Sequence, residues 1–399
     1  MRRQHLKVVS SSMDVKSKTL KLNLNIGDFI MAETSFAEQQ SKQKIAWCKD
    51  IWYEAKKQSE LPKFLGKGAK AVFTYVTELT QTKQGAKAIF QLLAPLMKDG
   101  VAGDNQLVGN EEEMTAHDQE ITLDRLSHAV KNVGRMDDQR GNIQFAKVAN
   151  PQLSEWLADR VDQLAFLTLL GISYDYNLDG SKRNDPTFQQ LAFAKDVKAP
   201  SENRYRVWSG GKLVKAGNNV LTATDTPNHK MLTDMITMAK RHNIKPLIVS
   251  GKKHYIIFMD ATAIGELKKD PDFMKSIINA SERGKNNPWF TGAIVTHDGA
   301  VIHETERVFN TLHAPAGEKW GADGKVNGVR IGLAGCQAVA FARIGDGTWD
   351  TEKFNYGNQI GVAHGRIIGF LKPTFPSSYS GTVEDFGVLT VDCAILGDD

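Results

Sequence analysis

Residues 99–140 constrain the fold more than any other stretch, because they are polar and glycine-rich and carry no recognisable reactive group. Gly100, Gly103 and Gly109 allow the positive φ angles that other residues resist, so the backbone can bend sharply at three closely spaced points. A moderately apolar strand pattern follows at Ile121, Leu123, Leu126, Ala129 and Val133. A two-stranded ribbon alone is marginal in water. We therefore expect a projecting ribbon that lies on another surface, such as that of a neighbouring copy.

Charge is unevenly distributed along the 399 residues. Residues 1–70 hold fourteen Lys or Arg and seven Asp or Glu, a net charge of +7, so the remaining 329 residues carry −3 of the total +4. One explanation is a solvated leader. An equally good one is a segment that faces DNA or an acidic partner, where neutralising phosphates requires no sequence recognition. The basic residues that would make such contacts are Arg2, Arg3, Lys7, Lys16 and Lys18.

Within the basic leader, Leu20, Leu22, Leu24 and Ile26 alternate strictly with polar residues, which predicts a strand with one apolar face. Nothing nearby offers a hairpin partner, and an unpaired strand edge tends to pair with another chain. We expect its partner to be distant in sequence or in another subunit. A capping-box pattern at Ser35 and Glu38 then predicts an amphipathic helix over residues 36–57.

The clearest helix signal follows the ribbon. Asn150 can cap it, Pro151 suits its first position, and an apolar face runs from Leu153 to Leu167 before Gly171 ends it. Residues 175–219 are polar and predict an exposed insertion loop. Its opening, Asp175, Asn177 and Asp179, has the spacing of a calcium-binding EF-hand loop, but the twelfth position is Pro186 instead of glutamate. A surface turn is the better interpretation.

From Met231 the composition changes to alternating helices and strands. Met231 to Ala239 give one helical face, residues 255–259 form a buried strand, and Asp260 can cap a helix that Pro271 terminates. Asp298-Gly299 lies between two strand-like runs and predicts a hairpin. No glycine fingerprint opens a helix after the first strand, which argues against a dinucleotide-binding domain.

Several function classes lack their sequence signals. The composition, 41% hydrophobic and 24% charged, suits a soluble globular protein with two core-bearing domains. Neither a secretion signal nor an apolar run of membrane-spanning length is evident. Cys48, Cys336 and Cys393 are widely separated and form no zinc-binding pattern, so we expect buried cysteines in a reducing compartment. No Walker, HExxH or GxSxG motif occurs. An uncatalogued hydrolase and a nucleic-acid-binding protein stay open as alternatives, without a cofactor, metal or catalytic residue to assign.

Four motifs in register carry a resemblance: GVAGDNQLVGNEE at residues 100–112, RGKNNPWFTGA at 283–293, FNYGNQIGVAHG at 354–365 and DFGVLTVD at 385–392. Together they resemble the major capsid proteins of tailed bacteriophages, in particular those of N-four-like podoviruses. The resemblance implies an α+β fold of the Hong Kong 97 capsid type. It further implies an N-terminal arm at 1–64, an extended loop at 65–120, a peripheral domain with a long spine helix and an insertion loop at 121–225, an axial domain at 226–342 and return strands of the peripheral domain at 343–399.

The resemblance also implies a structural function with no enzyme activity. Copies of the chain would assemble in the host bacterial cytoplasm into hexamers and pentamers of an icosahedral head, which encloses double-stranded DNA. Such a shell can bind scaffold, decoration and portal proteins, and we expect no contact with a membrane. We expect Gly100, Gly103 and Gly109 to shape the loop for assembly and residues 20–26 to add as a strand.

Overall fold

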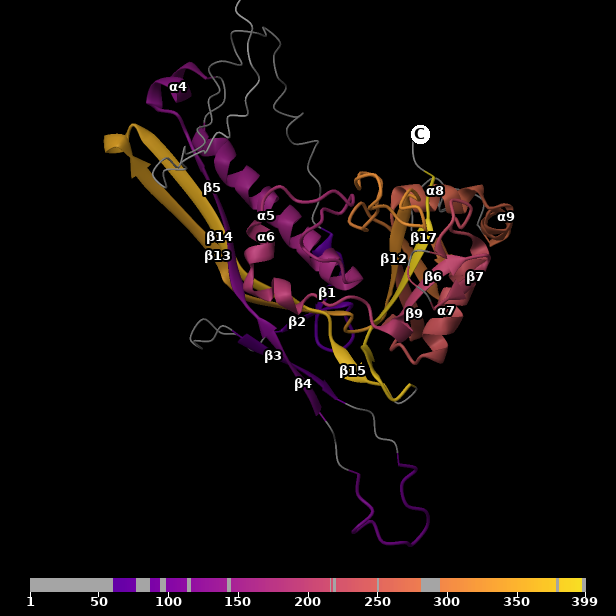
Figure 1. The fold of residues 1–399 in the computed structure, drawn as a ribbon. Coiled ribbons are helices and arrows are strands. Elements are labelled where there is room, and N and C mark those ends of the chain that lie inside the picture. The colour runs from indigo at the N-terminus through magenta and orange to yellow at the C-terminus, as the bar shows by residue number, and fades with distance from the viewer. Residues whose placement is uncertain are drawn as a thin grey trace, which may run out of the picture.

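The structure is a computed structural model that describes residues 60–76, 87–93, 98–112, 116–141, 145–215, 217, 220–249, 251–280, 295–377 and 380–396. The predicted strand at 20–26, the predicted helix at 36–57, the basic residues of the leader and Cys48 lie outside these ranges. Two separate sheets organise the described chain, with a long helix beside them and a ribbon that projects from the body (Figure 1). None of the described helices is long and apolar enough to cross a membrane.

The first sheet is long and five-stranded. Its order is β1 (Leu65–Lys67), β2 (Phe73–Val76), β13 (Val339–Phe354), β14 (Gln359–Leu371) and β5 (Asp124–Lys131). β13 and β14 form an antiparallel hairpin, paired from Ala340 and Leu371 to Phe354 and Gln359, where the short helix η4 (Asn355–Gly357) makes the turn. β2 runs parallel to β13 because the chain crosses the rest of the molecule between them.

The long helix α5 (Phe145–Leu170) packs against β5 and β14 and confirms the predicted helix, but not its start. We predicted that Asn150 would cap it, and this is wrong because the helix begins five residues earlier, at Phe145. The Asp138 carboxylate after α4 (Arg135–Arg140) accepts a hydrogen bond of 2.7 Å from the Phe145 amide, so a side chain seven residues upstream satisfies that first N–H group. The local sequence at Asn150 gave no sign of this.

The second sheet contains the strands β10 (Val295–His297), β11 (Ala300–Glu304), β9 (Lys252–Met259), β12 (Gly328–Ala334), β17 (Val388–Ala394), β6 (Tyr205–Ser209) and β7 (Lys212–Val214), with β8 (Leu247–Val249) paired to β9. Helices α7 (His229–Arg241), α8 (Ala261–Lys269) and α9 (Pro271–Ala280) accompany it. The predicted hairpin at Asp298-Gly299 is confirmed, and Asp260 caps α8 by accepting from the Thr262 amide. α8 ends at Lys269, and Pro271 is the first residue of α9. The proline therefore follows one helix and begins the next.

The closing strand β17 corrects a predicted topology. We expected residues 354–375 and 388–396 to complete the same sheet. Instead β17 lies between β12 and β6 in the second sheet, antiparallel to one and parallel to the other. All seven residues of β17 are buried, and a strand that is buried on both faces does not reveal from its sequence which sheet it will join.

Residues 175–219 also differ from the expected exposed insertion loop. They form α6 (Thr187–Gln190), η1 (Ala192–Asp196), η2 (Glu202–Arg204), β6 and β7, and they bury Phe188, Phe193 and Trp208. A few aromatic side chains hold this polar segment to the core because each buries a large apolar area. In the turn that resembles an EF-hand, Asp179 accepts hydrogen bonds from Ser181, and Asn177 donates one to the same serine.

The strands β3 (Lys87–Leu93) and β4 (Ala116–Thr122) form the projecting ribbon, and β15 (Thr374–Pro376) pairs with β16 (Val383–Asp385). The short helix α3 (Leu61–Phe64) precedes β1. Cys336 and Cys393 are buried free cysteines, as predicted. Burial raises the pKa of both thiols, which keeps them protonated and unreactive.

The crossing between the two sheets is tight enough to predict two opposite glycine substitutions. A Cβ atom at Gly387 would lie 2.4 Å from the Cys336 carbonyl oxygen, and the backbone there cannot move without disturbing both sheets. Gly387→Ala should therefore destabilise the protein by about 1–3 kcal/mol. Gly265→Ala, inside α8 with open space around it, should stabilise by about 1 kcal/mol. Urea denaturation of the two variants measures both effects, and equal midpoints would contradict the close approach at Gly387.

Candidate assembly surfaces

The loop at the end of the ribbon, residues 98–112, extends well beyond the body of the molecule (Figure 1). Gly100, Gly103 and Gly109 have φ angles of 86°, 64° and 88°, so the three predicted bends are confirmed. The Lys98 side chain donates to the Glu111 carbonyl at 2.7 Å, which ties the two sides of the loop together. The loop thus has a definite shape although it contains no core.

Two apolar side chains are presented at this loop. Leu107 is 69% exposed and Val108 is 82% exposed, and the turn that carries them is closed by a hydrogen bond from the Asn110 amide to the Leu107 carbonyl. Acidic residues surround them at Asp99, Asp104, Glu111 and Glu112. Adjacent exposed apolar residues with a polar rim are typical of a protein contact.

The base of the ribbon is held firmly by the body. Phe90, Leu92 and Ile121 are buried in a small cluster with residues of β13 and β14. A Cβ atom at Gly369 of β14 would lie 2.3 Å from the Thr122 carbonyl oxygen, so this glycine is needed for β4 to cross β14 closely. The expectation that the ribbon lies on another surface therefore holds for its base, where that surface belongs to the same chain.

A groove of about 1160 Å³ separates the ribbon from the second sheet. Its apolar lining includes Leu92, Ile244 and Phe375, and Lys240 and Lys253 also border it. Within the described residues no group of three or more His, Cys, Asp or Glu is placed to hold a metal ion. The groove therefore offers shape and apolar area, without a metal-binding cluster among its described residues.

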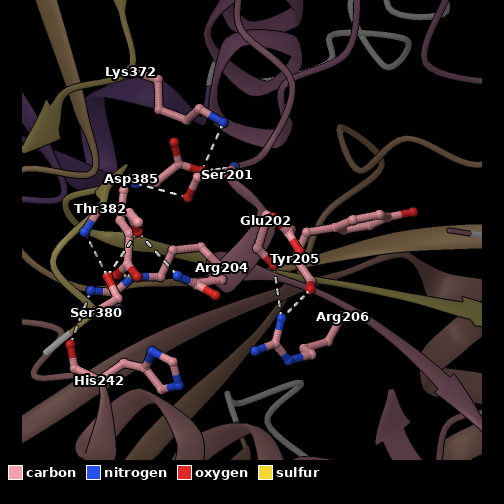
Figure 2. A network of polar contacts seen from close by, with 12 residues as sticks. Ser201, Glu202, Arg204, Tyr205, Arg206, His242, Lys372, Ser380, Thr382 and Asp385 are labelled. Carbon is pink, nitrogen blue, oxygen red and sulfur yellow. Dashed lines mark hydrogen bonds and ion pairs between the residues drawn. The ribbon is translucent and has the colours of Figure 1, made fainter. Parts of the chain in front are cut away.

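Buried ion pairs join the two sheets at their junction (Figure 2). Arg204, just before β6, pairs with Glu384 of β16 at 2.9 Å and also donates to the His242 carbonyl at the end of α7. Lys372, just after β14, pairs with Asp385 at 3.0 Å. Lys372 and Asp385 are each only 1% exposed, so removing one partner would leave an uncompensated charge inside the protein.

The pKa values at the junction reflect this burial. Burial lowers the pKa of Lys372, and the Asp385 charge offsets part of that effect. For Glu384, burial by itself raises the pKa, but hydrogen bonds to Ser380 and Asn203 and the charge of Arg204 outweigh it, so the pKa lies below its ordinary value. Glu384 therefore stabilises the folded state above about pH 4.5, and this contribution is lost as the pH falls through its lowered pKa.

The junction residues were not predicted from the sequence. The only signal they gave was charge placed directly beside apolar strands, as in Phe370-Leu371-Lys372 and Glu384-Asp385-Phe386. By contrast, the bends at the three loop glycines were predicted because the positive φ angles that they adopt are a local preference of glycine. The other predicted assembly residues, Leu20, Leu22, Leu24 and Ile26, lie outside the described residues.

Comparisons with known proteins agree on one family. The profile of a family described as phage capsid protein matches residues 35–396. The major capsid protein of Pseudomonas phage KPP25 is 42% identical over 363 residues, which cover 90% of this chain and 96% of that protein.

Solved structures show the same fold at lower identity. The capsid of Ralstonia phage GP4 superposes with a TM-score of 0.72 at 22% identity and covers 98% of this chain and 100% of its own. The capsid of cyanophage Pam1 gives a TM-score of 0.68 at 18% identity, covering 94% of this chain and 100% of its own. The likeness includes both sheets and the long helix, because it extends over nearly the whole chain.

The burial of Lys372 at the junction predicts that replacing this lysine has a large effect on the stability of the protein. Lys372→Met leaves the Asp385 carboxylate buried without its counter-charge, so it should cost about 3–5 kcal/mol of unfolding free energy. The double variant with Asp385→Leu should recover most of this loss. Lys182→Met is the matched control, because Lys182 pairs with Glu318 at the surface and its loss should change the urea midpoint little. A similar effect of both single variants would contradict the role of burial.

Proposed function

The chain belongs to the phage capsid protein family and is a major capsid protein of the Hong Kong 97 fold type, and from this premise we propose that its copies form the hexamers and pentamers of an icosahedral head. The observation that carries the proposal is the 42% identity to a phage major capsid protein over nearly the full length of both chains. Self-assembly into a shell is the function that its relatives share. The enzyme and nucleic-acid-binding alternatives are set aside because those relatives are structural proteins of the capsid.

We propose that the domains follow the family pattern, with boundaries that interleave. Residues 1–64 are the N-terminal arm, and the ribbon β3–β4 with its loop is the extended loop. The pairing of β2 with β13, and of β1 with β2, supports counting residues 65–76 with the peripheral domain. The pairing of β6 and β17 with each other, and of β17 with β12, supports counting these strands with the axial domain.

The extended loop acts, in this proposal, by lying on an adjacent subunit. Leu107 and Val108 supply the apolar contact, and Gly100, Gly103 and Gly109 supply the bends that present it. One surface then meets a different surface on the next copy, and such head-to-tail contacts close into rings when the rotation permits. Each contact is small, and their sum holds a subunit on several sides once the shell is closed.

The N-terminal arm would contribute a second contact through its alternating strand at residues 20–26, which can add to a sheet edge of a neighbour. Its net positive charge suits packaged double-stranded DNA, to which it would bind through phosphates without regard to sequence. Scaffold, decoration and portal proteins are further partners in this proposal, and assembly would take place in the cytoplasm of the host bacterium.

The first experiment is electron microscopy of the full chain expressed alone. Closed shells, or rings of five and six subunits, are the expected result. Material that stays monomeric at high concentration and is absent from phage heads would contradict the proposed function.

Gly103→Val tests the loop. Gly103 has a φ angle of 64° and open space around it, so valine strains the backbone without clashing with the body. The folded monomer should keep its urea midpoint, while the yield of shells falls at least tenfold. The control is Lys212→Ala, a change at an exposed residue of β7 far from the loop, which should leave both quantities as in the wild type (Figure 1). Normal particle yield from Gly103→Val would refute the role of the bend.

The arm is tested by replacing Leu20, Leu22, Leu24 and Ile26 together with serine. The polar residues between them remain, but the apolar face of the strand is lost. Assembly should therefore weaken, while the urea midpoint of the body stays unchanged. The matched control replaces Lys21, Asn23 and Asn25 with serine and should assemble normally. Light scattering against protein concentration measures the threshold for assembly in each case, and equal thresholds would contradict strand addition.

A further inference from the structure

The turn that joins β13 to β14 has an unusual backbone. Three successive residues, Asn355, Tyr356 and Gly357, have φ angles of 50°, 53° and 83°. Glycine adopts this left-handed region without strain and asparagine tolerates it, but a bulky residue such as tyrosine does so only at a cost to the folded state. The turn therefore contains one residue that its own conformation disfavours.

No packing among the described residues explains the choice of tyrosine. The Tyr356 side chain is fully exposed, at 109% of its reference area, so it contributes no packing to the described core. A strained position that carries an exposed aromatic residue is a reason to look for a function outside the subunit. Tyrosine is among the residues most enriched at the energetic centres of protein interfaces.

The turn is fixed to the body, so the side chain is presented in a defined place. Asn358 closes the turn by donating its amide to the Asn355 carbonyl at 3.0 Å. Asn132 after β5 exchanges two hydrogen bonds with Ile360, at 2.7 and 3.1 Å, and Gln359 donates its side-chain amide to the Val133 carbonyl at 2.9 Å. A pre-ordered anchor loses little conformational freedom on binding, which favours its use in a contact.

The surroundings of Tyr356 suit a second copy of the same chain. Met136 on the neighbouring helix α4 is 58% exposed and adds a second apolar side chain at this end of the molecule. The segments that flank the turn, residues 131–140 and 350–358, carry charges of both signs in equal number: Lys131, Arg135, Arg140 and Lys353 against Asp137, Asp138, Asp350 and Glu352. A nucleic acid or an anionic membrane would require an excess of positive charge. A balanced patch can complement a like patch on another subunit.

The position of the turn points to a contact distinct from that of the extended loop. In Figure 1 the turn lies at the far end of the β13–β14 hairpin beside α4, and the loop 98–112 lies at the opposite end of the molecule. A subunit that is held at both ends joins more neighbours than either end could reach. The two ends would thus connect different sets of copies.

We propose that Tyr356 is an anchor for contact between copies of this chain, kept in a strained turn because assembly needs the aromatic side chain there. This inference rests on the proposed shell-forming function and adds to it the residue and the surface of a second contact. It predicts that the stability of the subunit and its assembly change in opposite directions at this one position.

The test compares Tyr356→Asn with Tyr356→Phe in the full chain. Asparagine suits the left-handed backbone, so the urea midpoint of the monomer should rise, while the protein concentration needed for shell formation should increase at least tenfold. Phenylalanine keeps the ring and the strain, so its midpoint and its assembly threshold should both match the wild type. Tyr356→Gly should repeat the result of asparagine.

Each outcome decides a separate point. Wild-type assembly of Tyr356→Asn, with shells formed by the parent protein, would overturn the anchor and leave the shell-forming function intact. A lowered or unchanged urea midpoint in Tyr356→Asn would overturn the claim that the tyrosine strains the turn. Failure of the parent protein to form shells or rings under any condition would overturn the proposed function and this inference together.

Discussion

The burial of the last two turns of helix α5 between the two sheets is the interaction on which the rest of the structure depends. From Leu164 to Leu170 every side chain is fully buried, whereas earlier in the helix exposed and buried residues alternate. The Phe166 ring lies 5.9 Å from Phe73 of the first sheet and 5.2 Å from Phe258 of the second. Burying such a ring contributes about 1.5–3 kcal/mol. Because the same side chain contacts both sheets, neither could keep its core if the helix moved.

In this arrangement the rigid body and the projecting segments have different roles. The buried pairs Arg204–Glu384 and Lys372–Asp385 fix the angle at which the sheets meet, since charges inside a protein tolerate few alternative partners. The ribbon and the β13–β14 hairpin extend from that fixed body and gain contact area without enlarging the core (Figure 1). A shell subunit benefits from this division, because errors of position at the junction would be magnified at the distant ends.

The sequence predicted those features that nearby residues decide. The cap of α8, the Asp298-Gly299 hairpin and the three bends of the loop were all confirmed, because each depends on residues within a few positions. Where the deciding partner is distant, the prediction was wrong. The start of α5 depends on Asp138, and the fold of residues 175–219 depends on Phe193 and Trp208 finding a core that is built from other segments. Resemblance to a known family supplied the fold class, which no pattern of residues had specified.

By itself, then, the sequence determined the conformation of turns, the existence of helices and the lack of any recognisable catalytic motif. The tertiary structure alone decided the sheet to which β17 belongs, the pairing of the junction charges and the exposure of Tyr356. The physical reason is the separation along the chain between the residues that decide each feature. Backbone preferences and caps act within one turn of chain, whereas strand pairing and charge burial are selected by surfaces that exist only after distant segments have come together.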